Sequence, residues 1–201
     1  MVLYRRYNQG TANTPWRIRS VEDRGYAEKM VHKLEEAADQ GHAKAQVNLG
    51  AMYGNGHGVP QDYSAAMKWY QMAADQGVAK AQYNLGFMYK NGQGVAQDNS
   101  AAMKWYRMAA DQGHAGAQYN LGGMYYQGQG VPQNTSEALR WLHKAQVQGL
   151  DIAKQLTELI MRKMRETRAS QQTNNSSMPS PSASPIPIGT RVELHGLKAK
   201  P

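Results

Sequence analysis

Residues 81–89 read AQYNLGFMY, and this stretch decides the fold because the chain contains it in three versions. Residues 45–53 read AQVNLGAMY and residues 117–125 read AQYNLGGMY, each 36 positions from its neighbour. A fixed period between about 20 and 50 residues is typical of stacked structural repeats, which cannot bury their apolar faces alone. The sequence therefore predicts a repeat protein whose function depends on an extended surface.

Each repeat is predicted to be a pair of antiparallel helices. In the second repeat, Ala81, Leu85 and Met88 have the spacing of one face of an amphipathic helix, and a glycine-rich stretch then ends it. The second helix begins near Asp98, whose side chain suits an N-cap, as do the side chains at the equivalent positions. In the third repeat, Glu137 stands at the reciprocal position of a capping box. The three predicted units are 41–76, 77–112 and 113–148.

Small and large residues recur at fixed positions in these units. A glycine in a helix interior costs about 1 kcal/mol relative to alanine, so its recurrence indicates a steric demand. A recurring tryptophan is interpreted as a core residue that joins adjacent helix pairs, in preference to an exposed stacking platform. The glycines are Gly50, Gly86 and Gly122, and the tryptophans are Trp69, Trp105 and Trp141.

The net charge of +8 is unevenly distributed. Residues 41–149 contain eight Lys or Arg and five Asp or Glu, whereas residues 150–201 contain eight and four. The positive excess is therefore densest after the repeats, and the repeats carry no basic stripe of the kind that binds nucleic acid.

The 201 residues include no cysteine, which excludes disulfides, a cysteine metal site and a catalytic thiol. The sequence shows no secretory leader and no apolar run of about 20 residues, so a cytoplasmic protein is expected.

The pattern of 81–89, followed by Gly-x-Gly-Val, Ala-x-x-Trp-x-x-x-Ala and a closing Gln-Gly, resembles the Sel-1-like repeat family of tetratricopeptide-type proteins. The resemblance covers 41–149. It implies an all-α, right-handed α-solenoid of antiparallel helix pairs, acting as a non-enzymatic adaptor for a protein or peptide partner.

The flanks depart from the repeat pattern. Residues 1–21 show no period and are predicted to be an irregular arm, and residues 22–40 resemble a degenerate half-repeat that caps the array. Residues 150–168 fit a C-terminal capping helix, because Thr157 and Glu158 replace the Leu-Gly pair. Residues 169–201 are predicted to be a disordered tail with a truncated strand near its end.

The resemblance places the first helices on the inner face of the solenoid, where a partner would bind. One asparagine recurs in each first helix and is predicted to grip a peptide backbone, with a structural hydrogen bond as the alternative. Neighbouring positions vary between repeats, as a specificity surface does, and aromatic residues dominate such surfaces; each could also pack inside. The candidates are Asn48, Asn84, Asn120, Lys80, Tyr83, Phe87, Tyr119 and Tyr126.

Other chemistries receive less support from the sequence. The glycine loops follow helices and contain no Gly-Lys-Ser/Thr, which disfavours phosphate binding. No catalytic residue, metal ligand or cofactor is predicted. A hydrolase is disfavoured, because the relatives linked to β-lactam binding or hydrolysis are cysteine-rich. The alternative function is nucleic-acid or anionic-membrane binding through the basic positions Arg162, Lys163, Arg165 and Arg168, which a solvated helix end also explains.

Overall fold

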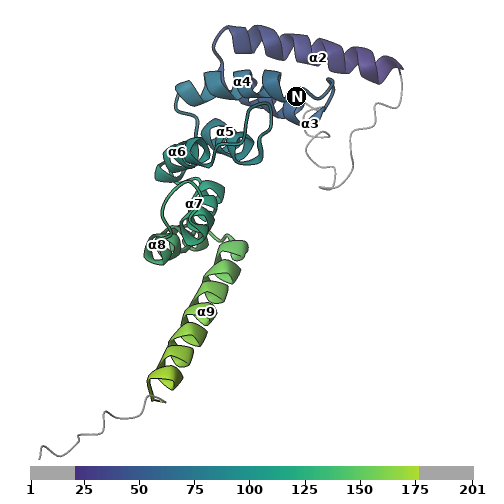
Figure 1. The fold of residues 1–201 in the computed structure, drawn as a ribbon. Helices are drawn as coiled ribbons and strands as arrows, with labels where there is room; N and C mark the ends of the chain where they lie inside the picture. Colours follow the sequence, from purple (N-terminus) through teal and green to yellow (C-terminus); the bar gives the residue numbers. More distant parts are fainter. Residues whose placement is uncertain (1–20, 177–201) are drawn as a thin grey trace, which may run out of the picture. The chain divides into compact units, whose positions relative to one another are not determined.

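The computed structural model describes residues 21–176, and all the regular structure in this part of the chain is helical (Figure 1). Residues 1–20 of the predicted arm, and the predicted strand in the tail beyond residue 176, lie outside the described residues. The helices are α2 (Val21–Asp39), α3 (Ala43–Asn55), α4 (Tyr63–Asp75), α5 (Ala79–Asn91), α6 (Asn99–Asp111), α7 (Ala115–Gln127), α8 (Thr135–Val147) and α9 (Asp151–Ser176).

The helices pack in the order of the sequence. Helix α3 pairs with α4, α5 with α6 and α7 with α8, which forms the three predicted antiparallel pairs. Between pairs, α2 packs against α3, α4 against α5 and α6 against α7. The prediction of an all-α stack of helix pairs is therefore confirmed.

The chain forms two compact units, 1–159 and 160–201, and their boundary falls inside α9. In the second unit, α9 continues beyond the predicted end at Arg168 to Ser176. Residues 169–176 were expected to belong to the tail. They are helical because Ala169, Gln171 and Gln172 favour helix and no proline occurs before Pro179. None of the helices in 21–176 has the length and apolarity that a bilayer crossing requires.

The second helices begin at the predicted N-caps. The Asp98 carboxylate accepts hydrogen bonds from the backbone N–H groups of Ser100 and Ala101, at 2.8 and 3.0 Å. Asp62 repeats this geometry in the first repeat.

The N-cap of the third repeat differs from a complete capping box. Asn134 accepts from the Glu137 N–H at 3.0 Å, but the Glu137 side chain pairs with Arg140 at 3.5 Å instead of returning to Asn134. The Asn134 N–H is already used, because it donates to the Tyr125 carbonyl at 2.8 Å.

The recurring helical glycines allow the two helices of a pair to approach closely. A Cβ on Gly50 would lie 2.6 Å from the Tyr70 ring, and one on Gly86 would lie 2.7 Å from the Tyr106 ring. In the third repeat Leu142 takes the place of the tyrosine, again 2.6 Å from a Cβ built on Gly122. The steric demand inferred from the sequence is confirmed.

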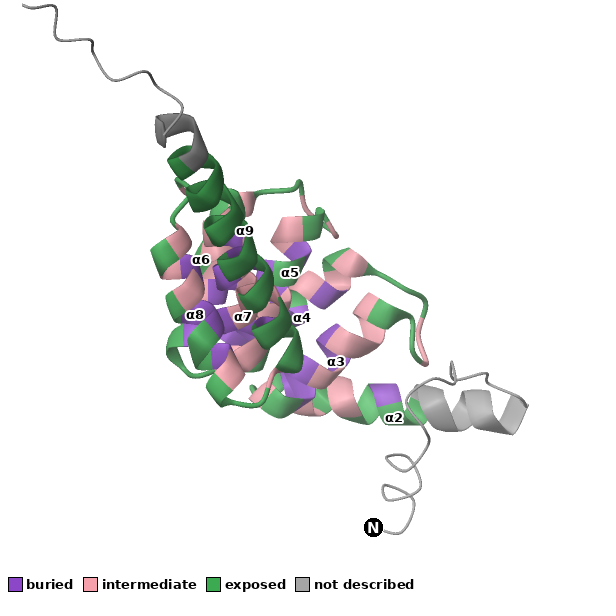
Figure 2. Cartoon of the chain, turned by 90° about the horizontal axis from the view of Figure 1, so that it is seen from below, coloured by how far each residue is buried: buried purple, intermediate pink, exposed green. Residues whose placement is uncertain are grey.

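The apolar core runs between the helices, with the buried residues on the faces that α3 to α8 turn toward one another (Figure 2). Trp69 and Trp141 are buried, as predicted. Trp105 is only half-buried and packs at the edge of the cluster formed by α3, α4 and α5, so the core assignment holds for it only in part.

A buried amide network joins successive repeats. Gln82 of α5 donates to the Ala74 carbonyl at the end of α4 and accepts from Gln112 at the end of α6, at 3.4 and 2.8 Å. The Ala74 carbonyl also accepts a hydrogen bond from the Gly77 N–H at 2.9 Å, so Gln82 is its second donor. Gln46 and Gln118 make the same two bonds in their own repeats. The donation from Gln46 goes to Ala38 of α2, which supports α2 as the second helix of a preceding half-repeat.

Candidate functional site

The predicted contact residues lie along one side of each first helix. On α5, Lys80, Tyr83, Asn84 and Phe87 have the 3-4-7 spacing that puts side chains on one helix face. We call the corresponding faces of α3, α5 and α7 the first-helix surface. Its predicted members are Asn48 on α3, Lys80, Tyr83, Asn84 and Phe87 on α5, and Tyr119, Asn120 and Tyr126 on α7.

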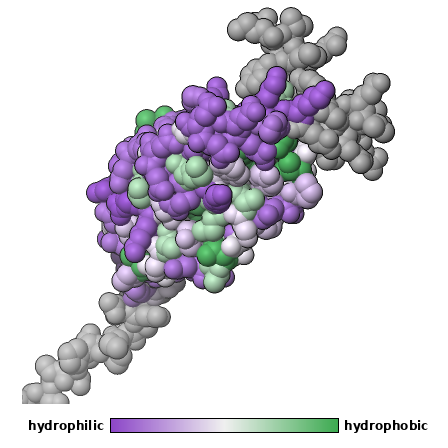
Figure 3. All heavy atoms as spheres, turned by 90° about the horizontal axis from the view of Figure 1, so that it is seen from above, coloured by the Kyte–Doolittle hydropathy of each residue, from purple (hydrophilic) through white to green (hydrophobic). Residues whose placement is uncertain are grey.

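A hollow of about 160 Å³ opens on this surface beside Asn84 and Phe87. Phe87 is 44% exposed and is the most exposed aromatic residue in the described part of the chain. On the face drawn in Figure 3, hydrophilic residues cover most of the surface and hydrophobic residues form smaller patches. The other residues lining the hollow are Gly54, Asn55, Tyr63, Tyr70, Met88 and Gln93.

The asparagines of the second and third repeats each lie near a buried tyrosine of the preceding repeat. Asn84 shares the hollow with Tyr70, whose pKa burial raises to about 12. Asn120 lies by Tyr106, whose pKa is raised first by burial and then by Tyr83, whereas Asn120 lowers it. No hydrogen bond of good geometry joins this pair, and the Tyr106 hydroxyl is buried without a partner.

Asn48 has no such tyrosine neighbour. The position equivalent to Tyr70 and Tyr106, 36 residues before Tyr70, is Leu34 of α2. The three asparagines are all half-buried, so a partner can reach them only in part. Asn84 alone lines the hollow.

Tyr83 contributes mainly to packing between repeats. Its ring stacks on His114 with centroids 4.5 Å apart and is tilted against Tyr106 at 5.8 Å. A Cβ on Gly116 of α7 would lie 3.2 Å from the same ring. Tyr83 therefore fixes α5 against the start of α7, and its half-buried ring is less available to a partner than Phe87.

His114 caps α7, a role that the sequence analysis did not identify. Its Nδ1 accepts a hydrogen bond from the Ala117 N–H at 3.2 Å, which requires this nitrogen to be unprotonated. Burial lowers the pKa of His114, its own backbone hydrogen bond opposes the shift, and the charge of Lys80 lowers the pKa further. Lys80 itself is exposed at the edge of the first-helix surface.

Helix α7 presents two half-buried tyrosines with an open position between them. Tyr119 and Tyr126 lie two turns apart on one face, and Gly123 lies between them, about one turn from each. A Cβ on Gly123 would meet nothing within 4 Å. The third repeat thus leaves space at the position where the second repeat carries Phe87.

The sequence analysis missed the floor and rim of the hollow. Tyr70 belongs to α4, Asn55 is the last residue of α3, and Gln93 lies in the loop after α5, so none of them falls on the predicted face. The recurrence of an aromatic residue directly after Trp69 and Trp105 was the available signal, because it places Tyr70 and Tyr106 against the glycines.

The structure also places the basic positions and the potential metal ligands considered in the sequence. The basic positions 162, 163, 165 and 168 are exposed on α9, where Arg162 pairs with Glu166 at 3.8 Å. The His, Asp and Glu side chains of the described residues form no group of three that could hold a metal ion.

Comparison with protein-family models gives three matches to the Sel1 repeat, at residues 43–78, 79–114 and 115–145. Together they cover just over half of the chain, and each begins two residues after a predicted repeat boundary. A search of curated proteins gives no match.

Two solved structures are similar in both sequence and fold, each with a TM-score of 0.59. One is c5321, a protective antigen of uropathogenic Escherichia coli strains that displays an SLR fold; it is 43% identical over 60% of this chain, which spans only 26% of that protein. The other is a Sel1 repeat protein from Oxalobacter formigenes, 38% identical over 65% of this chain and 98% of its own.

Helicobacter pylori cysteine rich protein B shares the fold alone. It is 20% identical over 69% of this chain and 98% of its own, with a TM-score of 0.54.

Proposed function

Because the chain belongs to the Sel1 repeat family, we propose that it is a non-enzymatic adaptor that binds a peptide or protein partner along the first-helix surface. Sel1 repeat proteins generally mediate protein interactions. The proposal goes further in naming the surface and the kind of partner.

The observation that carries the proposal is the exposed Phe87 ring beside the hollow. Large aromatic side chains next to a pocket are the usual anchors of protein interfaces. The Asn84 amide on the same lining can both donate and accept hydrogen bonds, which suits the backbone of an extended peptide.

The size of the hollow favours a peptide side chain over a small-molecule ligand. Pockets for cofactors and drug-sized ligands enclose ~300–1,000 Å³. The hollow of about 160 Å³ has room for one apolar side chain packed between Phe87 and Tyr70. We therefore propose a peptide that inserts an apolar residue there while its backbone pairs with Asn84.

The test begins with peptides selected from a random display library on the wild-type chain. Their affinities are then measured by fluorescence anisotropy for Phe87→Ala and Asn84→Ala variants. We expect each substitution to weaken binding by 1 kcal/mol or more, roughly the threshold that marks an interface anchor.

Gln71→Ala is the matched control, because Gln71 lies on α4 and bonds only to Asp75 on its own helix. It should leave the affinity unchanged. Selected peptides that bind Phe87→Ala and Asn84→Ala as tightly as the wild type, with the helical circular dichroism intact, would refute the first-helix site.

The second candidate function is binding of nucleic acid or anionic membrane through the basic stretch of α9. The exposure of Arg165 and Arg168 on this helix favours it. It predicts strongly salt-dependent binding to RNA or anionic vesicles that is lost when residues 160–201 are deleted. Binding that survives the deletion would eliminate this function.

A further inference from the structure

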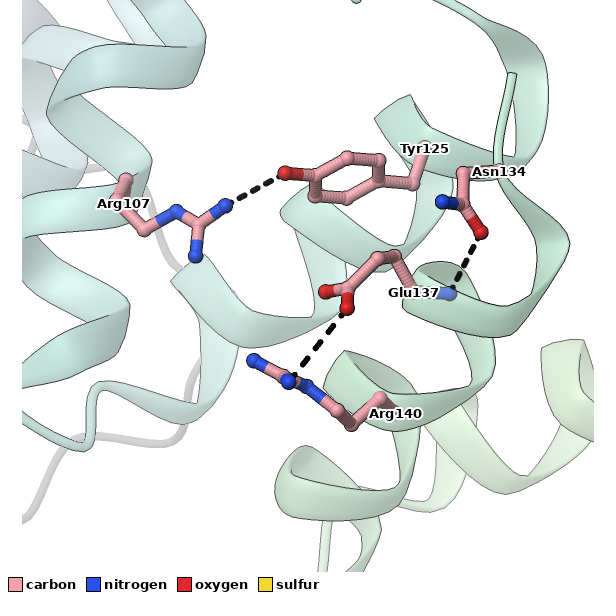
Figure 4. Close-up of polar contacts among 5 residues, drawn as sticks. All are labelled: Arg107, Tyr125, Asn134, Glu137 and Arg140. Atoms are coloured by element: carbon pink, nitrogen blue, oxygen red, sulfur yellow. Dashed lines mark hydrogen bonds and ion pairs between the residues drawn. The ribbon is translucent and has the colours of Figure 1, made fainter. Parts of the chain in front are cut away.

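Three cationic side chains of the second helices α6 and α8 lie close to the ring of Trp141. The Lys144 Nζ lies 4.2 Å from the Trp141 ring centroid, and the guanidinium carbons of Arg107 and Arg140 lie 4.9 and 5.7 Å from it. Arg107 reaches across from α6 and also donates a hydrogen bond to the Tyr125 hydroxyl (Figure 4). We call Arg107, Arg140 and Lys144 the cation cluster.

The cluster has little compensating negative charge. Within the described part of the chain, Glu137 is the one acid that pairs with it, at 3.5 Å from Arg140 (Figure 4). Arg140 and Lys144 are exposed, so their charges are open to an approaching anion. The cluster therefore carries a net positive charge that one more anionic group would reduce.

Packing of the tryptophan does not require the cluster, as the other repeats demonstrate. Trp69 has a single cation over its ring, Lys68 at 5.8 Å, and Trp105 has none among the described residues. At the positions of Arg107 and Lys144, the first repeat carries Gln71 and Met72. The extra charges are thus specific to the boundary between the second and third repeats.

We propose that the cation cluster is a second docking site, which binds an acidic segment of a protein partner through its carboxylates. Arginine guanidinium groups pair with carboxylates in a bidentate manner, and Lys144 adds a mobile point charge. Exposed apolar side chains on the same two helices, Met108 at 46% and Val147 at 73%, suit a segment that mixes acidic and apolar residues.

The restricted extent of the cluster favours a peptide over a nucleic acid. Strong binding to a duplex relies on some 6–10 phosphate contacts along a basic track. Residues 41–149 contain eight basic and five acidic residues, which is a small positive excess, and the cluster lies at one repeat boundary. A short run of carboxylates matches this arrangement.

The test measures fluorescence anisotropy of a labelled peptide of alternating Glu and Leu, with alternating Gln and Leu as the neutral control. The wild-type chain should bind the acidic peptide only, with lower affinity at high salt. Removing two cations in Arg140→Gln/Lys144→Gln should weaken binding by about tenfold, while leaving the Arg107–Tyr125 contact in place.

Lys68→Gln/Lys104→Gln is the matched control, since it removes two exposed charges from equivalent helices of the other repeats. It should change the affinity by less than about twofold. Equal losses in both double variants, tighter binding of an RNA duplex than of the acidic peptide, or no binding by the wild type would each overturn the proposal.

A failure of this second docking site can be distinguished from a failure of the function proposed above. Phe87→Ala should leave binding of the acidic peptide unchanged, because Phe87 belongs to the first-helix surface. An equal loss in this variant would show that the acidic peptide occupies the hollow and would refute the second site.

Discussion

Gly86 and Gly123 are both helix-interior glycines, but their surroundings differ completely. A Cβ on Gly86 would press into the buried Tyr106 ring at 2.7 Å, whereas one on Gly123 would meet nothing within 4 Å. The first glycine is therefore a packing requirement, and the second is an open place on the first-helix surface.

Substitution of each glycine by alanine should give opposite effects on stability. Gly86→Ala should lower the free energy of unfolding by about 1–3 kcal/mol through overpacking. Gly123→Ala should raise it by ~0.5–1 kcal/mol through helix propensity. Urea denaturation followed by circular dichroism measures both, and a neutral Gly86→Ala would contradict the close approach of α5 and α6.

His114 should make the stability depend on pH. Its pKa is lowered in the folded state, so the unfolded chain binds a proton more readily. The stabilisation it confers is therefore complete above its unfolded pKa near 6.5 and is lost as the pH falls through the lower folded pKa.

We expect the free energy of unfolding to decrease between pH 7.5 and 5.5, by at most ~1.4 kcal/mol per pH unit for this one group. His114→Asn, which supplies a cap that does not titrate, should flatten the dependence. An identical pH profile for the variant would show that the His114 cap does not form.

At the level of helices, the buried glutamines explain how one pair is joined to the next. Gln82 connects the end of α4 to the end of α6 through α5. Apolar contacts alone set no register between helices, whereas these bonds have direction and fixed partners.

Gln82→Ala should destabilise the chain by about 1–3 kcal/mol, because it removes two buried hydrogen bonds, each contributing roughly 0.5–1.5 kcal/mol. The Gln112 amide loses its acceptor, whereas the Ala74 carbonyl keeps the Gly77 N–H as a donor. Gln71→Ala, at a half-exposed position, should stay within ~0.5 kcal/mol of the wild type. Thermal unfolding of the two variants, measured in parallel, compares their melting temperatures. Equal melting temperatures would refute the structural role of the network.

The period of the sequence predicted the helices, the N-caps of the second helices and the close glycine contacts, because each depends on local spacing. The capping role of Asp98 and the packing role of Gly86 could be predicted from the sequence of a single helix pair. The Gln82 network, the Tyr70–Asn84 hollow and the cation cluster could not, because their members come from different helices. Periodicity shows which positions recur but not which of them meet. The same limit explains why Tyr83 was placed among the partner anchors although its ring stacks on His114.

Across the stack of repeats, the two helix types carry different chemistry. The first helices present Phe87, Asn84 and the tyrosines of α7, while α6 and α8 present the cation cluster. A repeat protein can vary each surface separately, because the core positions that hold the stack are distinct from both. Under the adaptor function that we propose, this separation allows the two surfaces to bind different partners.

The measurement that tests the adaptor role most directly is site-specific photo-crosslinking to a display-selected peptide. Benzoylphenylalanine is placed at Asn55, which lines the hollow, or at Gln71, the control position on α4. The peptide should crosslink from position 55 and not from position 71. Crosslinking from position 71 alone would contradict binding on the first-helix surface.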